Sequence, residues 1–277
     1  YLLSILPFGV LRILSDGMFF LMYRVFGYRR QVVETNLRNS FPEMSDAEIE
    51  QISKEFFRHL CDLMLETFKI LTISPTTMMR HCRFTPEAKA LFDSLAAQDQ
   101  SIVMVMGHQG NWEWAGHPYS LLCQHKLHVI YHPLSNKYFN NLMLRMRTRF
   151  GTKMIPMRDT FREMVNHKSE LTNTVFIGDQ TPAPQNAYWT TFLNQDTPVF
   201  KGTETIARKV NNPVVYAQIR KYKRWHYEMY AEVLVEDPRN TEEGEITELF
   251  TKRLEKDIVD QPETWLWSHR RWKHRRA

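Results

Sequence analysis

The residues best suited to chemistry are His108 and Glu113, in the stretch Gly107-His-Gln-Gly-Asn-Trp-Glu113. An imidazole oriented by a carboxylate can accept a proton from a hydroxyl group, so the pair predicts a general base and its partner. Five residues of regular helix would turn the two side chains apart, so a turn must lie between them. Gly107 and Gly110 permit that turn. The stretch favours an enzyme that activates a hydroxyl group over a half-buried histidine beside a surface glutamate.

Apolar runs alternate with helical patterns along the chain. This alternation predicts an α/β fold, with a central, mainly parallel sheet flanked by helices. The expected strands are 102–106, 128–131, 153–155, 174–177 and 213–219, with a further, antiparallel strand at 225–235. The expected helices are 30–39, 45–71, 87–97, 113–123, 137–150, 160–167, 201–210 and 244–259, the second of which opens with the capping box Ser45-Asp-Ala-Glu48.

Asp179 follows the strand expected at 174–177. Sites in open α/β sheets gather beyond the carboxyl ends of the strands, and His108 also follows a strand, so both are expected at one edge. Either Glu113 or Asp179 is therefore the carboxylate that holds His108, and the sequence leaves this choice open. An aspartate that caps a turn is the alternative for Asp179.

Four arginines form a second candidate cluster: Arg145, Arg147, Arg149 and Arg158. Arginine suits phosphate groups because its guanidinium donates two parallel hydrogen bonds. A solvated helix face is the alternative. Five histidines between residues 108 and 132 raise the possibility of a metal, but none has the H-E-x-x-H spacing. We expect a helix that starts near Asn111 to turn His117 away from His108.

The composition narrows the class of partner. The 277 residues carry a net charge of +5, which suits nucleic acid, an anionic membrane or an acidic protein. The C-terminal stretch after Pro262 mixes tryptophan with basic residues, as membrane-interface segments and single-strand binders do. No nucleic-acid fold signature accompanies it, so a membrane or an acidic partner is favoured and nucleic acid is not. The three scattered cysteines predict a reducing compartment and no structural zinc.

The N-terminal segment is mostly apolar between Leu2 and Phe26, with Arg12 and Asp16 inside it, spaced to pair on one helix face. A bilayer span needs about 20 apolar residues with few charges. The segment therefore predicts an anchor over residues 1–28 that lies on the membrane or ends a span, with a buried helix as the alternative. Residues 29–277 are expected to form a single α/β domain.

The ordered set of motifs resembles the bacterial lipid A biosynthesis acyltransferases, members of the wider lysophospholipid and glycerol-phosphate acyltransferase superfamily. The motifs that carry the resemblance are Gly107–Glu113, Tyr131-His-Pro-Leu-Ser-Asn136, Arg147-Thr-Arg149 with Arg158, Gly178-Asp-Gln180 and Trp-Ser-His-Arg-Arg-Trp-Lys273. His132 stands where family members often have arginine, so the identity of the molecule that accepts the acyl group stays open.

The resemblance implies a glycerol-phosphate acyltransferase-like fold with N-terminal membrane-associated helices, on the cytoplasmic face of the bacterial inner membrane. It implies transfer of an acyl group from a thioester of acyl carrier protein, or of coenzyme A, to a hydroxyl of a lipid A precursor, with no metal and no cofactor. The implied catalytic residues are His108 and Glu113. The implied substrate-binding residues are Gly110, Asn111, Tyr131, Arg147, Arg149, Arg158, Gly178, Asp179 and Gln180, with Arg149 or Arg158 as one source of oxyanion contacts.

Three other functions fit the same residues. The acceptor can be another glycolipid, an aminolipid or a lysophospholipid, or it can be water, as in a lipid hydrolase. A non-catalytic protein of the membrane surface is the third alternative, and it predicts that His108, Glu113 and Asp179 lie apart in space.

Overall fold

The central feature of the fold is a seven-stranded sheet, described by a computed structural model that covers residues 1–276; Ala277, the last residue of the expected domain, lies outside them. The strand order is β1-β9-β8-β2-β5-β3-β4. The strands are β1 (Cys82–Phe84), β2 (Ile102–Met106), β3 (Lys126–Tyr131), β4 (Lys153–Pro156), β5 (Thr172–Ile177), β8 (Val214–Lys223) and β9 (His226–Val235). All neighbouring strands pair in parallel except β8 and β9, which are antiparallel. The predicted α/β class and mainly parallel sheet are confirmed.

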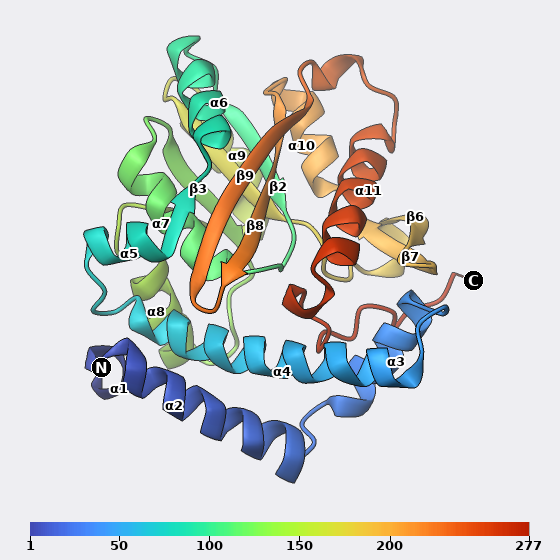
Figure 1. Ribbon diagram of the computed structural model, residues 1–277. Helices are drawn as coiled ribbons and strands as arrows, with labels where there is room; N and C mark the ends of the chain where they lie inside the picture. The colour runs from blue at the N-terminus through green and yellow to red at the C-terminus, as the bar shows by residue number, and fades with distance from the viewer. Residues whose placement is uncertain (277) are drawn as a thin grey trace.

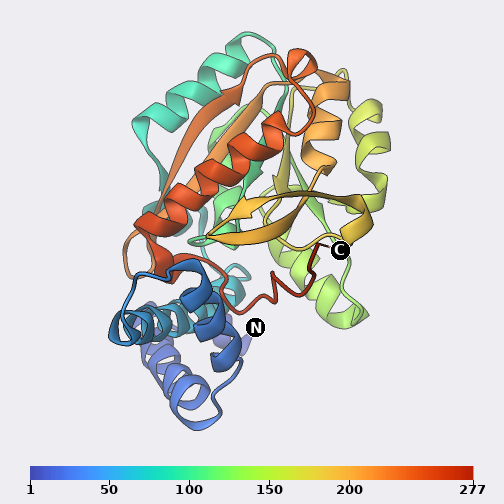
Figure 2. The same ribbon diagram turned by 90° about the vertical axis from the view of Figure 1, so that its right-hand side faces the viewer.

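Helices cover both faces of the sheet (Figure 1). They are α1 (Leu2–Ile5), α2 (Phe8–Phe19), α3 (Arg30–Ser40), α4 (Asp46–Lys69), α5 (Pro75–His81), α6 (Pro86–Ala97), α7 (Trp112–Leu122), α8 (Lys137–Arg147), α9 (Thr160–Asn166), α10 (Gly202–Val210) and α11 (Glu245–Asp260). Short π or 3-10 turns are η1 (Phe20–Val25), η2 (Met157–Asp159), η3 (Pro184–Asn186), η4 (Pro238–Asn240) and η5 (Pro262–Thr264). Figure 2 shows α11 packed across one face, with the N-terminal helices gathered at one end of the sheet.

Strand β2 is buried on both faces, so its side chains enter two different cores. Val103 and Val105 pack with α10 and α11, whereas Met104 and Met106 pack with α5 to α8. This explains its continuous apolar sequence, which is typical of a central parallel strand. Because His108 comes two residues after Met106, the strand delivers it to the edge of the second core.

The sequence did not predict β1, α5 or a separate hairpin of β6 (Ala187–Phe192) and β7 (Gln195–Phe200). Two residues, Leu193 and Asn194, join the hairpin strands, and both have positive φ. Glycine usually marks such a turn, and its absence here removed the usual signal.

Helix α4 runs past the carboxyl ends of the parallel strands (Figure 1). Its predicted capping box is present, with Ser45 and Glu48 bonded reciprocally. His59 Nε2 contacts the carbonyl oxygen of Gly110 at 3.0 Å, and the Trp114 indole donates to the carbonyl of Glu66 at 2.8 Å. The helix therefore holds the end of the loop that follows β2 and the first turn of α7.

The N-terminal segment packs along α4. Ser15 Oγ donates to Asp62 at 2.7 Å, and Arg224 bridges Asp62 and Asp16. Asp16 thus binds Arg224 rather than Arg12, because the fold brings the β8–β9 turn beside α2. Within residues 1–276, no helix combines the length and the apolar character that a membrane span requires.

Gly110 turns the loop after β2 at a position where another residue meets backbone. Its φ is +61°, and a Cβ there would lie 2.0 Å from the carbonyl oxygen of Ile219. We expect Gly110→Ala to lower the free energy of unfolding by at least about 2 kcal/mol, because the left-handed conformation alone costs roughly 1–2 kcal/mol. Urea unfolding measures this change. Gly202→Ala is the control, since no atom lies within 4 Å of its Cβ position, and similar small effects for both variants would contradict the prediction.

Candidate active site

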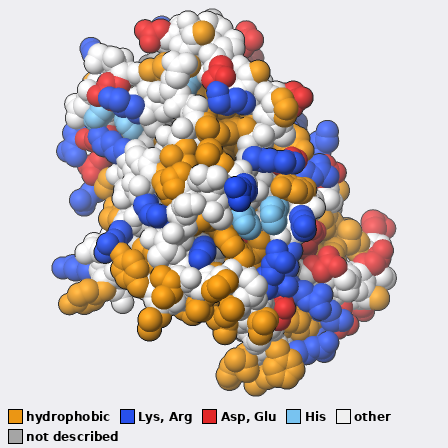
Figure 3. Space-filling view, turned by 60° about the vertical axis from the view of Figure 1, so that its left-hand side comes forward, with side chains coloured by type: hydrophobic (Ala, Val, Ile, Leu, Met, Phe, Trp, Pro, Cys, Tyr) orange, Lys and Arg blue, Asp and Glu red, His pale blue; other side chains and the backbone are white. Residues whose placement is uncertain are grey.

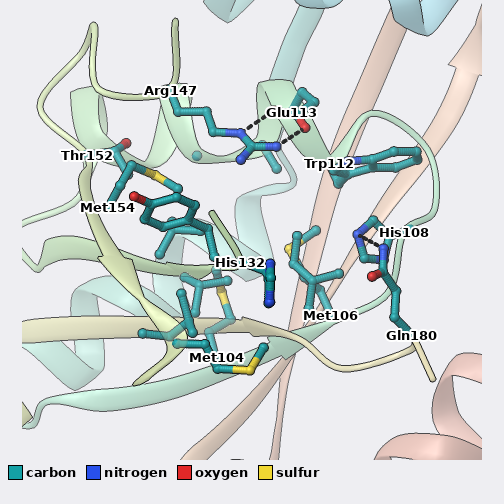
Figure 4. A pocket seen from close by; sticks show the side chains of 18 of the residues that line it. Met104, Met106, His108, Trp112, Glu113, His132, Arg147, Thr152, Met154 and Gln180 are labelled. Atoms are coloured by element: carbon teal, nitrogen blue, oxygen red, sulfur yellow. Dashed lines mark hydrogen bonds and ion pairs between the residues drawn. The ribbon is translucent and has the colours of Figure 1, made fainter. Parts of the chain in front are cut away.

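A cavity of about 570 Å³ opens beside the carboxyl end of β2 (Figure 4). Its walls come from β2, β3, β5 and α7, and from the segment that follows β5. Apolar side chains form most of the lining: Met104, Met106, Leu127, Val129, Ile130, Met154, Val175 and Ile177. Polar groups enter at His108, Glu113, His117, His132, Arg147 and Gln180. A mostly apolar cavity with a few convergent polar groups is typical of a site for a lipid-like ligand.

His108 is held by Asp179, which settles the carboxylate left open by the sequence. Its Nδ1 lies 2.5 Å from Asp179 Oδ1, and its backbone N–H donates to Oδ2 at 2.8 Å. The Trp265 indole donates to the same Oδ2 at 2.8 Å. Asp179 therefore holds His108 through its ring and its backbone, while a third donor fixes the carboxylate.

Asp179 remains ionised despite being only 3% exposed. Burial alone would raise the pKa of its carboxyl, but the charge and hydrogen bonds of His108 outweigh that effect. Together with the nearby Arg271 guanidinium they lower the pKa to about 2. A charged carboxylate at Nδ1 favours the tautomer in which Nε2 is free to accept a proton.

The Nε2 atom of His108 faces the cavity. The Gln180 amide lies 3.3 Å from it and donates a long hydrogen bond, a contact that a substrate hydroxyl could replace. The Trp112 ring packs edge-on against the imidazole, with centroids 5.2 Å apart. These neighbours restrict the rotation of His108 and leave its reactive nitrogen toward the space where a ligand would lie (Figure 4).

Glu113 does not hydrogen-bond to His108. It forms a bidentate ion pair with Arg147, at 2.6 and 2.8 Å, in the wall of the same cavity. Burial would raise the pKa of Glu113, but the hydrogen bonds and charge of Arg147 lower it below its ordinary value. The expectation that Glu113 orients His108 through a direct contact is therefore wrong, because α7 begins at Trp112 and points Glu113 toward α8.

Six of the nine predicted substrate-binding residues divide into two groups. Tyr131, Arg147 and Gln180 line the cavity. Gly110, Asn111 and Gly178 lie behind it and shape its frame: Asn111 caps α7 and donates to Glu66, while Gly178 packs against Phe250.

Arg149 and Arg158, the two arginines predicted to contact the oxyanion, do not line the cavity. Arg149 donates to the carbonyl oxygens of Ile70 and Ile73 just beyond α4. Arg158 has an 86% exposed side chain beside Asp159. Among the four arginines singled out in the sequence, Arg147 alone lines the cavity, since Arg145 stacks over Tyr1.

The C-terminal stretch contributes to the site, which the sequence did not indicate. Trp265, Trp267 and Arg271 are at most 2% exposed, so these side chains are core residues rather than a membrane-facing surface. Leu266 N–H donates to the carbonyl of His108 at 3.1 Å, which anchors the loop after β2 directly. The mixture of aromatic and basic residues suggested a surface segment. Several of these side chains are instead buried, and Trp265 contacts Asp179.

His117 also differs from its expected position. It lines the same cavity as His108, because it follows Glu113 by four residues and so shares that face of α7. Within residues 1–276, no three His, Cys, Asp or Glu side chains gather in an arrangement suited to a metal ion.

The fold and the site define an α/β enzyme in which a histidine–aspartate pair faces a lipid-sized apolar cavity. The chain belongs to the bacterial lipid A biosynthesis acyltransferase family, whose model matches residues 1–274, and it is therefore an acyltransferase. It is 25% identical over 272 residues to the lipid A biosynthesis palmitoleoyltransferase of Escherichia coli K12 and equally to the lipid A biosynthesis acyltransferase of Shigella flexneri. Each alignment covers 98% of this chain and 87% of the relative.

Acid stability tests the ionised state of Asp179. An unfolded aspartate has a pKa of about 3.9, and the folded value is about 2. Ionised Asp179 therefore contributes about 2 kcal/mol that is complete above about pH 5 and is lost as the pH falls toward 2. We expect the difference in unfolding free energy between wild type and Asp179→Asn to shrink over that range. A difference that stays constant from pH 5 to pH 2 would show that Asp179 is not ionised in the folded protein.

Proposed function

We propose that the protein moves an acyl group from a thioester to a hydroxyl on a 3-hydroxyacyl chain of a lipid A precursor. The observation that carries this proposal is the His108–Asp179 pair, whose free Nε2 faces the apolar cavity. The pair can activate a hydroxyl, and the cavity can hold a hydrocarbon chain beside it. Family membership supports lipid A as the acceptor class.

In the proposed reaction, His108 Nε2 removes the acceptor hydroxyl proton as the oxygen bonds to the thioester carbonyl carbon. Asp179 keeps the imidazole in the required tautomer and stabilises its charged form. Collapse of the tetrahedral intermediate breaks the carbon–sulfur bond, and the departing thiolate takes the proton back from His108. The enzyme ends unchanged, without a covalent intermediate.

Arg147 takes the role of oxyanion contact, which the family resemblance assigned to Arg149 or Arg158. Its guanidinium is fixed by Glu113 in the cavity wall, so it offers oriented donors to the oxyanion or to a substrate phosphate without a reorganisation cost. Glu113 thus acts through Arg147, and the charge of His108 also helps to lower the pKa of Glu113. Glu113 therefore keeps a role in the proposed reaction, but it orients Arg147 rather than His108.

An acidic acyl carrier protein is the donor we favour over coenzyme A. Arg270, Lys273 and Arg275 are exposed near the end of the chain, which follows directly on the segment that anchors His108. Positive charge near the entrance steers an acidic partner toward the site. A thioester delivered there would place its carbonyl beside the histidine and its chain in the cavity.

The N-terminal helices provide a surface for the cytoplasmic face of the inner membrane. Their outward side chains are apolar and exposed: Tyr1, Leu2, Leu3, Ile5, Val10, Ile13, Leu14, Phe20, Leu21, Val25, Phe26 and Tyr28. Figure 3 shows hydrophobic side chains gathered along this lower edge of the molecule with Lys and Arg beside them. Such a surface suits insertion between headgroups, with basic side chains on anionic lipid.

Acyl transfer by purified variants tests the chemistry. We expect His108→Ala to reduce transfer to a lipid A precursor by at least about 10²-fold, because a general base commonly contributes 10²–10⁴-fold. Glu113→Ala should also lose about 10²-fold or more, through misplacement of Arg147. Mass spectrometry of the lipid product gives the rate, with carrier-protein and coenzyme A thioesters compared in parallel. Folding of each variant is checked by circular dichroism.

Near-normal transfer by folded His108→Ala would refute the assigned base. Release of free fatty acid without lipid acceptor, at a rate equal to transfer, would identify a hydrolase instead. Transfer to a lysophospholipid or an aminolipid in preference to the lipid A precursor would show that the acceptor is a different lipid. The proposed mechanism would then be unchanged.

Vesicle binding tests the membrane surface. We expect Ile13→Ser with Phe26→Ser to weaken co-sedimentation with anionic phospholipid vesicles by about 10-fold or more, because burying a large apolar side chain contributes about 1.5–3 kcal/mol. Val259→Ser is the matched control, since Val259 is an exposed apolar residue on α11. Equal binding by the double variant and the control would place the membrane contact elsewhere.

A further inference from the structure

His117 is a buried polar side chain that the proposed reaction does not use. It is 1% exposed and lines the cavity, yet neither ring nitrogen has a hydrogen-bond partner among residues 1–276. Buried polar groups are nearly always paired, so an unpaired imidazole in a ligand cavity requires an explanation. A ligand group that meets these nitrogens would supply the missing hydrogen bonds.

The position of His117 places that group away from the reacting atoms. It lies four residues, about 6 Å along the helix axis, beyond Glu113 on α7. The ring of Phe150 closes one side, with centroids 5.1 Å apart. Thr152 also lines the cavity, and its hydroxyl shares a hydrogen bond with the Ser120 hydroxyl at 3.0 Å. The mostly apolar cavity therefore has a polar position on α7, one turn beyond Glu113.

The chemistry of His117 limits what it can bind. Burial lowers the pKa of its imidazole to about 4, so the ring is neutral at neutral pH. A neutral imidazole offers one donor and one acceptor, which matches a hydroxyl group. The neutral ring carries no charge to balance a phosphate or a carboxylate.

We propose that His117 is a hydroxyl-binding subsite that selects an acyl chain carrying a hydroxyl group well along its length. This inference rests on the proposed function in one respect, that the cavity holds an acyl chain. A hydroxyl at carbon 3 would stay close to the reacting carbonyl at His108, whereas one in the middle or at the end of the chain would reach the turn of α7 that bears His117. A plain chain would bury the imidazole without any partner, which a polar site rejects.

Competition between donors of one chain length tests this subsite. The probes are palmitoyl thioesters that are plain or that carry a hydroxyl at carbon 3, in the middle of the chain or at its end. We expect the wild type to prefer a mid-chain or terminal hydroxyl over the plain chain by about 10-fold in kcat/KM, and His117→Leu to abolish this preference. His117→Gln, which retains a donor and an acceptor, should restore part of it.

His128→Leu is the matched control. His128 is also a buried histidine with an unpaired ring nitrogen, but it does not line the cavity. Its replacement should leave the preference as in the wild type. Because each preference is a ratio measured on one protein, a partial loss of folding cancels.

Failure of this subsite is distinguishable from failure of the proposed function. A wild type that transfers plain and hydroxylated chains equally, with no change in His117→Leu, refutes the subsite and leaves the acyltransfer proposal intact. A wild type that transfers none of these donors refutes the proposed function. In that case, calorimetric binding of palmitate and its hydroxylated forms still tests the subsite, and equal affinities would overturn it.

Discussion

The carboxylate of Asp179 is buried, charged and bonded to three donors. A buried charge is stable only when its hydrogen bonds are complete, so the elements that supply them must meet at one point. They are the end of β5, the loop after β2 and the segment after α11. Gly107 belongs to the same constraint, because a Cβ there would lie 2.6 Å from Leu254 and 3.3 Å from Asp179.

Two side-chain pairs share the site without sharing hydrogen bonds. His108 Nδ1 contacts the Asp179 carboxylate, and Arg147 forms an ion pair with Glu113. Each carboxylate is bonded within its own pair, so the mostly apolar cavity beside them stays compatible with a hydrocarbon chain. This arrangement differs from a single triad, because the second carboxylate, Glu113, orients an arginine rather than the histidine.

Helix α4 supports this arrangement from behind. Glu66 accepts hydrogen bonds from Asn111 and Tyr227, and burial raises the pKa of its carboxyl to about 8. A protonated Glu66 avoids a further uncompensated charge in the core while still holding the cap of α7. The same helix carries the N-terminal segment on its other side, so the proposed membrane surface and the loop after β2 are fixed to one helix.

The sequence by itself determined the α/β class and most strands and helices, because hydrophobic periodicity and helix caps are local signals. It also singled out His108, which lines the cavity. It could not choose between Glu113 and Asp179. The nearer carboxylate turns away with α7, whereas Asp179 arrives from 71 residues along the chain. The buried roles of Trp265 and Arg271 and the inward face of His117 were likewise decided by tertiary structure, since burial depends on which distant elements pack together.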